Sequence, residues 1–77
     1  MTSVTIYSTD SCPWCRKAEE YLEHNNISFN LKKVDNDRDA AVEMVQKSGQ
    51  QGVPVLDIDG KIIVGFNKPE IDSSLGL

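Results

Sequence analysis

Residues 7–22, YSTDSCPWCRKAEEYL, contain both cysteines of this 77-residue chain, Cys12 and Cys15. Before the pair, residues 3–8 (SVTIYS) alternate and are rich in β-branched side chains, which predicts a strand. After Cys12, residues 13 to about 25 favour a helix, and a proline is tolerated in a first helical turn because its missing N–H is unpaired there. The two thiols are therefore expected where a strand ends and a helix begins.

The rest of the chain repeats this mixture of strands and helices. Asp59-Gly60 is a hairpin signal between two short apolar runs, Gly49 fits the end of a helix, and Pro69 fits the start of another. After the first strand and helix, we expect a strand at residues 27–35 and a helix at 35–49. Two hairpin strands at 52–58 and 61–66 and a last helix at 67–77 follow.

This order, β-α-β-α-β-β-α, predicts an α/β fold with a four-stranded mixed sheet and helices on both faces. The first two strands are joined by a helix, so they are expected to be parallel. The last two strands are expected to form an antiparallel hairpin. Residues 1–77 are taken as a single domain, because the length leaves no room for a second core.

Composition excludes several classes of function. The net charge is −4 with the acidic residues spread along the chain, which argues against a nucleic-acid partner. No apolar run approaches the roughly 20 residues that span a bilayer, and the N-terminus does not resemble a secretory signal. A cytoplasmic monomer without a membrane partner is the default expectation.

The placement of the cysteines predicts a redox role. A helix N-terminus carries free N–H groups and partial positive charge, so a thiolate at Cys12 is stabilised there. Cys15 lies one turn later on the same face, close enough to form a disulfide. Cys12 is therefore predicted to attack and Cys15 to resolve, and the charges of Arg16 and Lys17 are candidates to assist the attack.

Two other interpretations of the pair stay open. A structural disulfide would close a very short loop and remove little entropy from the unfolded chain. A zinc or iron–sulfur site normally needs four ligands, and His24 is nine residues from Cys15, too far along the helix to share a metal. His24 is expected to be exposed in the last helical turn, and a metal site is not expected in the single chain.

A cluster carrier that bridges two chains through Cys12 is the alternative function.

Three separated motifs resemble those of the glutaredoxin family. They are Tyr7-Ser8-x-x-x-Cys12-Pro13-Trp14-Cys15, Gly52-Val53-Pro54 and Gly65-Phe66, in this order along nearly the whole chain. The resemblance implies a thioredoxin-like fold and a dithiol-disulfide oxidoreductase that uses a reversible Cys12–Cys15 disulfide. It also implies a cis peptide bond at Pro54, where the backbone of Val53 would pair with an extended substrate.

The resemblance further implies a substrate cleft and an electron donor. No bound cofactor is expected; electrons would come from glutathione or from a thioredoxin-reductase-type flavoenzyme. The substrates would be proteins with disulfides, or mixed disulfides with glutathione. The cleft is expected to be formed by Pro13, Trp14, Val53, Pro54, Gly65, Phe66 and Asn67.

The chain departs from the glutathione-binding pattern at several positions. Thr9 stands where a lysine commonly pairs with the carboxylate of glutathione, and Asp10 after it is expected to repel an anion. Phe66 is expected to narrow the approach, and Lys68 reverses the charge of the acidic residues found there in the family. Glycine-phenylalanine followed by Pro69 looks more like the redoxins that serve ribonucleotide reductase. Weak glutathione binding is therefore predicted.

Overall fold

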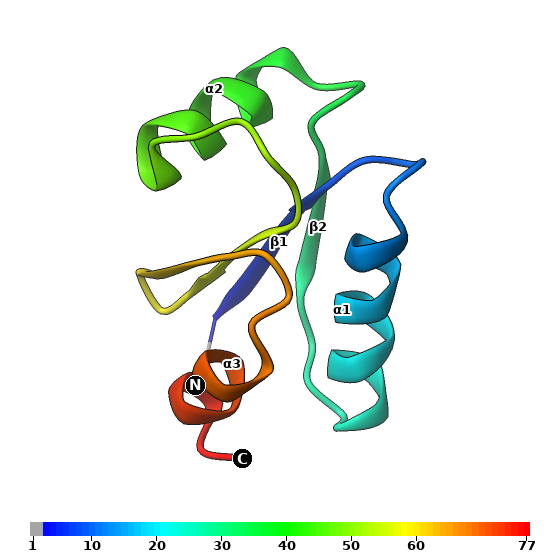
Figure 1. The fold of residues 1–77 in the computed structure, drawn as a ribbon, viewed down its shortest axis with the longest axis vertical. Helices are drawn as coiled ribbons and strands as arrows, with labels where there is room; N and C mark the ends of the chain where they lie inside the picture. The colour runs from blue at the N-terminus through cyan, green and yellow to red at the C-terminus, as the bar shows by residue number, and fades with distance from the viewer. Residues whose placement is uncertain (1–2) are drawn as a thin grey trace.

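The computed structural model describes residues 3–77, which form the seven elements predicted from the sequence in the predicted order (Figure 1). The strands are β1 (Val4–Ser8), β2 (Asn30–Lys33), β3 (Val55–Ile58) and β4 (Lys61–Val64). The helices are α1 (Pro13–His24), α2 (Arg38–Ser48) and α3 (Lys68–Leu75). None of the helices in this range is long and apolar enough to cross a membrane.

The four strands form one mixed sheet in the order β2-β1-β3-β4. β1 and β2 are parallel and β3 and β4 are antiparallel, as expected. The sequence did not predict that β3 also pairs antiparallel with β1, with Tyr7 opposite Val55. Because Val55 directly follows Pro54, this register places the Pro54 loop beside the end of β1 from which the cysteine loop departs.

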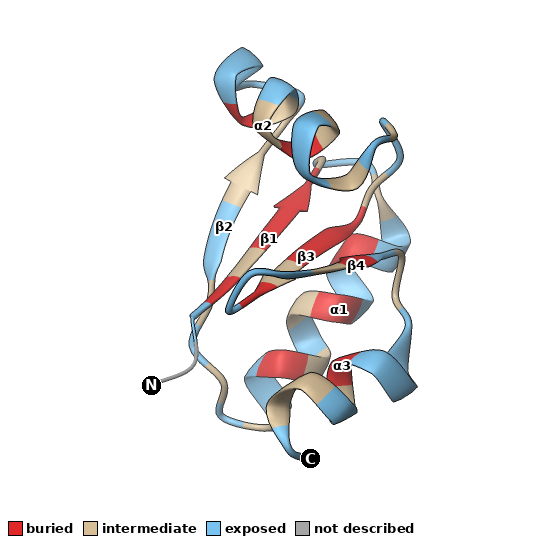
Figure 2. Ribbon diagram, turned by 90° about the vertical axis from the view of Figure 1, so that its left-hand side faces the viewer, coloured by how far each residue is buried: buried red, intermediate tan, exposed pale blue. Residues whose placement is uncertain are grey.

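The helices cover both faces of the sheet. Val4 and Ile6 of β1 join a buried cluster with Leu22 of α1 and Ile71 of α3, so these two helices share one face. Tyr7 points the other way and packs with Met44 of α2. The opposite directions follow from the alternation of side chains along a strand. Figure 2 shows the buried residues gathered on the two central strands and on the inner sides of the helices.

All four strands are shorter than predicted, β1 by a single residue and the other three by more. Ile27 and Phe29 alternate like strand residues, yet they precede β2 and pack on the core from a loop. The amide of Ile27 is occupied by a hydrogen bond to the carbonyl of Leu22 at 2.9 Å, which extends the end of α1. The first residue of β2 that pairs with β1 is Asn30.

The other two corrections lie beside the cysteines. Residues 52–54 do not belong to β3, because Pro54 has no N–H to donate to a sheet and the Val53–Pro54 peptide is cis. β4 ends at Val64 because Gly65 turns the chain with a φ of 80°. The hairpin prediction is confirmed. Asp59 and Gly60 have φ values of 52° and 93°, and the favoured two-residue hairpin turn requires a positive φ at both of its central residues.

Candidate active site

Cys12 is the N-cap residue of α1. Its backbone is extended, with φ −96° and ψ 108°, and its sulfur accepts a hydrogen bond from the backbone N–H of Cys15 at 3.1 Å. Pro13 lies in the first turn, where a backbone N–H would have no partner within the helix, so the proline costs no hydrogen bond. The sulfur of Cys12 thus takes the place that a serine or aspartate oxygen takes in an ordinary cap. A negative charge on this sulfur would be stabilised by the free N–H groups of the helix.

The two thiols have different environments. Cys12 is partly exposed, whereas Cys15, in the first turn of α1, is completely buried. Burial raises the pKa of the Cys15 thiol to about 12, and its hydrogen bond with Cys12 adds to the rise. Cys15 is therefore held as a protonated thiol behind Cys12. An attacking Cys12 and a resolving Cys15 would need this difference in access.

Five predicted cleft residues line one groove beside the cysteines. The groove has a volume of about 310 Å³ and is lined by Trp14, Val53, Pro54, Gly65 and Phe66. They come from the start of α1, the loop before β3 and the loop after β4. The amide of Gly65 donates a hydrogen bond to the carbonyl of Pro54 at 2.8 Å, which holds these two loops together. The cis bond expected from the resemblance is present.

Trp14 and Phe66 of this groove belong to a row of aromatic rings that continues to Tyr21. The rings of Trp14 and Phe66 lie 6.4 Å apart, and Phe66 meets Tyr21 edge-on at 5.8 Å. Tyr21 and Phe66 pack against the core, so the row is fixed at its inner end. Trp14 at its outer end is 57% exposed, with the ammonium of Lys17 5.4 Å from its ring centre. An incoming partner would therefore meet Trp14 first.

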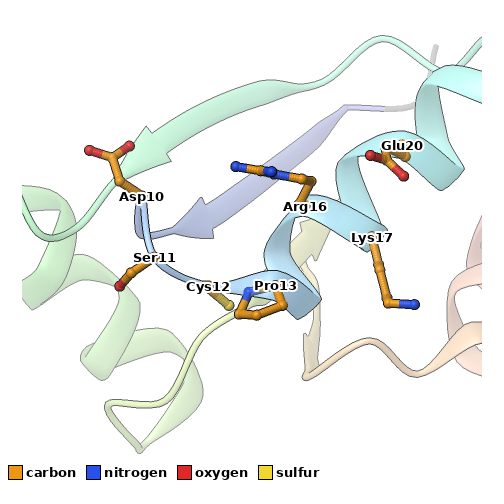
Figure 3. Close-up of a pocket in the computed structure, with 7 residues that line it drawn as sticks. All are labelled: Asp10, Ser11, Cys12, Pro13, Arg16, Lys17 and Glu20. Carbon is orange, nitrogen blue, oxygen red and sulfur yellow. The ribbon is translucent and has the colours of Figure 1, made fainter.

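A second hollow, of about 460 Å³, is lined by Cys12 itself (Figure 3). Pro13 lies next to Cys12 in this hollow and does not line the groove. The side chains of Arg16 and Lys17 leave α1 in different directions. The complete lining is Asp10, Ser11, Cys12, Pro13, Arg16, Lys17 and Glu20. Sequence reasoning missed Ser11 and Glu20, which carry no motif signal.

Two charged side chains that were expected to act on an incoming anion, Asp10 and Lys68, form ion pairs within the protein. Asp10, expected to repel an anion, lies 3.0 Å from the ammonium of Lys33. Lys68, expected to reverse the charge at the cleft, lies 3.0 Å from Asp72 and 5.2 Å from the ring centre of Tyr21. Both charges are partly neutralised, although both ion pairs are exposed enough to be weak.

Asn67 is the predicted cleft residue that lines neither hollow. It is exposed and is the N-cap residue of α3, where its side chain accepts a hydrogen bond from Glu70 at 3.4 Å. His24 is exposed in the last turn of α1, as predicted. Among residues 3–77 there is no group of three or more His, Cys, Asp and Glu side chains that could hold a metal ion.

A charged network on the opposite face was also missed from the sequence. The hydroxyl of buried Tyr7 donates a hydrogen bond to Glu43 of α2, and Lys32 of β2 contacts the same carboxylate at 2.9 Å. These bonds lower the pKa of Glu43 from 4.5 to about 2. Lys47 joins α2 to Asp57 of β3 at 2.7 Å. The four-residue spacing of Glu43 and Lys47 was the available signal. The network joins α2 to β1, β2 and β3.

A dithiol at the N-terminus of a helix, beside a cis proline and under a four-stranded mixed sheet, defines a thioredoxin-like protein. The solved structure of a thioredoxin-like protein is similar to this chain with a TM-score of 0.90 and 26% identity, and the match covers 95% of this chain and 94% of that one. The family model for glutaredoxin matches residues 4–63. The chain belongs to the glutaredoxin family.

Two relatives agree with this assignment. An uncharacterized glutaredoxin-like 8.6 kDa protein in a rubredoxin operon of Clostridium pasteurianum is 55% identical over 69 residues, which cover 90% of this chain and 92% of that protein. Glutaredoxin 3 of Escherichia coli is 34% identical over 65 residues, which cover 84% of this chain and 78% of that protein. Family membership supports thiol-disulfide oxidoreductase chemistry in general. The Gly65-Phe66 motif lies outside the matched residues 4–63.

Proposed function

We propose that this protein reduces protein disulfides through a reversible disulfide between Cys12 and Cys15. The observation that carries the proposal is the difference between the two thiols. Cys12 is accessible and accepts a helix N–H, whereas Cys15 is buried and has a raised pKa. A structural disulfide would not need one reachable sulfur, but a nucleophile does.

The reaction takes place in two exchanges. The thiolate of Cys12 attacks one sulfur of the substrate disulfide, a new S–S bond forms, and the other substrate sulfur leaves as a thiolate that takes up a proton. The sulfur of Cys15 then attacks Cys12, and the second substrate sulfur leaves. The substrate has gained two electrons and two protons, and the protein holds the Cys12–Cys15 disulfide.

The groove beside Cys12 is suited to an extended substrate segment. Val53 lies outside β3, so its backbone groups are free of the β1–β3 ladder and can pair with an incoming chain. Trp14 and Phe66 offer an apolar wall next to that segment. The substrate of this proposal is a protein disulfide whose flanking residues can lie extended along the groove.

The electron donor in this proposal is a thioredoxin-reductase-type flavoenzyme, and glutathione binds weakly. Thr9 supplies no cation for a glutathione carboxylate, and Asp10 beside it is acidic even though Lys33 pairs with it. Lys68 begins α3, two residues after Phe66, at a point of the chain where the glutathione-binding pattern has acidic side chains.

The test compares two reducing systems on one insulin-type protein disulfide. One contains NADPH, glutathione and glutathione reductase; the other contains NADPH and thioredoxin reductase. We expect turnover mainly with the second. Robust turnover with glutathione would overturn the donor assignment and leave the reaction in place. Full activity of Cys12→Ser would overturn the proposed reaction itself.

A further inference from the structure

The loop between α2 and β3 is held by the side chain of Gln50. Its carboxamide oxygen accepts a hydrogen bond from the backbone N–H of Gly52 at 2.6 Å. Its carboxamide nitrogen donates one to the carbonyl of the same residue at 2.9 Å. One side chain therefore occupies both polar groups of the Gly52 backbone, as a residue of a neighbouring strand does in a sheet.

Gly52 leaves the space that this contact needs. A Cβ atom at position 52 would lie 2.7 Å from the carboxamide oxygen of Gln50, and the next two nearest atoms also belong to that carboxamide. Gly52 is not among the glycines with a positive φ, so its backbone conformation does not require a glycine. The missing side chain thus makes room for Gln50.

A second link ties Gln50 to the end of α2. The hydroxyl of Ser48, the last residue of α2, donates a hydrogen bond to the carbonyl of Met44 at 2.7 Å. The same oxygen accepts a hydrogen bond from the backbone N–H of Gln50 at 3.4 Å. Met44 is buried in the core. The main chain is therefore braced from the core of α2 as far as Gly52.

Val53, the next residue, has its side chain fixed and its backbone open. The side chain is half-buried against the cluster of Tyr7, Met44 and Val55. Among residues 3–77, no hydrogen bond uses the backbone N–H or C=O of Val53. Because Val53 also lines the groove beside the cysteines, these two groups are available to a substrate there.

Gln50 controls the direction of one of these two groups. The carbonyl of Gly52 and the N–H of Val53 belong to a single planar peptide unit, in which they point in opposite directions. Because Gln50 holds that carbonyl, it also fixes the direction of the Val53 N–H, away from its own side chain. Without this bond the peptide unit could rotate, and binding a substrate would have to order it first.

Resting on the proposed function, we propose that Gln50 is a positioning residue for the substrate. By holding the carbonyl of Gly52, its carboxamide presents the N–H of Val53 to the extended segment that carries the substrate disulfide. Gln50 itself touches neither the substrate nor the cysteines. Its effect is confined to disulfides carried by a polypeptide, whose backbone carbonyls can accept this N–H. A small disulfide without an amide gains nothing from it.

The experiment compares two disulfides in single-turnover reactions. Reduced protein supplies both electrons itself, so no reductase is added. It is mixed with an excess of a peptide disulfide or of hydroxyethyl disulfide, quenched with acid at successive times, and analysed by mass for loss of the reduced form. We expect Gln50→Ala to lower the ratio of the two second-order rate constants, peptide to hydroxyethyl, about fivefold.

The ratio is a readout that a merely structural role would not move. A change in the reactivity of Cys12, or in the fraction of folded protein, alters both rate constants equally and cancels. Gln50→Glu sharpens the test, because it keeps the shape and the acceptor for the N–H of Gly52 but loses the donor to the carbonyl. We expect its ratio to fall as in Gln50→Ala. A wild-type ratio in Gln50→Glu would overturn the proposed role of the carbonyl.

Gly52→Ala tests the same contact from the other side. Its Cβ would displace the carboxamide of Gln50, so the ratio should fall to a similar extent. Adding Gln50→Ala to Gly52→Ala should lower the ratio no further, because the interaction is already lost. Decreases that multiply in the double variant would show that the two residues act separately, and would overturn the proposal.

Gln46→Ala is the matched control, because it removes the same kind of side chain from an exposed position of α2. It should leave the ratio unchanged, and a decrease equal to that of Gln50→Ala would overturn the specific role of Gln50.

A wild-type ratio in Gln50→Ala would also overturn this role, whether both rate constants fall together or neither falls. The proposed function would survive that result, because the wild-type protein still reduces the peptide. If wild type reduced neither disulfide, the proposed function itself would be contradicted.

Discussion

The backbone N–H of Cys15 donates a hydrogen bond of 3.1 Å to the sulfur of Cys12. The second cysteine thereby supports the first through its main chain, while its own side chain is buried. The three-residue spacing produces this arrangement, because the N-cap side chain of a helix reaches the amide three positions on. One helical turn thus gives two chemically different thiols.

The two thiols should differ strongly in reactivity toward iodoacetamide. Cys12 is partly exposed, whereas Cys15 is buried and has a pKa raised to about 12, so little of it is thiolate at neutral pH. We expect Cys12 to be modified faster by more than roughly a hundredfold. Peptide mass analysis of briefly labelled protein measures the ratio. Equal labelling of the native protein would contradict the assigned roles.

Cys15→Ser should accumulate mixed disulfides with substrates. Without the resolving thiol, the bond from Cys12 to the substrate has no internal attacker and persists. Non-reducing electrophoresis followed by reduction and mass identification would count and name the trapped partners. Cys12→Ser is the control and should trap nothing, even though its Cys15 remains. Trapping by Cys12→Ser at a similar level would reverse the two assignments.

Trp14→Ala should weaken the binding of protein substrates. Trp14 is 57% exposed at the rim of the groove, so its removal should raise KM about fivefold and change the free energy of unfolding by less than about 0.5 kcal/mol. Val42→Ala on α2, which removes another exposed apolar side chain, is the matched control and should leave KM unchanged. Steady-state kinetics with a protein disulfide distinguish the two variants.

Glu43 should contribute to the pH dependence of stability. The hydrogen bonds from Tyr7 and Lys32 lower the pKa of Glu43 from 4.5 to about 2, so its stabilising effect is complete above pH 4.5 and is lost as the pH falls toward 2. Glu43→Gln should therefore flatten the stability curve in this window. The effect is modest, since the carboxylate is partly exposed.

Urea denaturation of Glu43→Gln and wild type at several pH values between 2 and 6 measures this difference. Glu23→Gln, at an exposed position of α1, is the control. If the free energies of unfolding of wild type and Glu43→Gln changed in parallel with pH throughout this window, the hydrogen bonds to Glu43 would not stabilise its charged form.

Leu22→Ala should destabilise the whole domain. Leu22 is fully buried where α1 packs on the sheet, and loss of such a side chain costs about 2–5 kcal/mol in the free energy of unfolding. Leu31→Ala on β2 removes the same atoms from a side chain that is 40% exposed, and should cost less than about 1 kcal/mol. Similar losses for both variants, measured by chemical denaturation, would contradict the position of the core.

The sequence predicted the fold well where a signal is local. The alternation in β1, the hairpin at Asp59-Gly60 and the left-handed Gly49 after α2 all depend on residues close together in the chain. The predicted strand ends failed at residues 27–29 and 52–54. At residues 27–29 the limit is set by where β1 is available as a partner, about which propensity has no information. At residues 52–54 it is set by Pro54, which has no N–H to donate to the sheet.

The candidate site divides in the same way. Cys12, Cys15 and the residues of the groove could be identified from the sequence, because the order and spacing of their motifs bear directly on the chemistry. The ion pair of Asp10 with Lys33 and the hydrogen bond from Tyr7 to Glu43 join residues far apart in the chain, and no sequence pattern predicted them. Sequence reasoning therefore treated Asp10 as an unopposed charge.

The sequence by itself determined the reactive pair: two cysteines three positions apart, after a strand and at a proline-marked helix start, fix a thiol pair on one helical turn. Only the tertiary structure decided how the pair is surrounded. Burial of Cys15 and the approach of the Pro54 loop beside β1 both require the helix to pack on the sheet. The physical reason is that burial and charge pairing are properties of neighbours in space, which the order of residues does not specify.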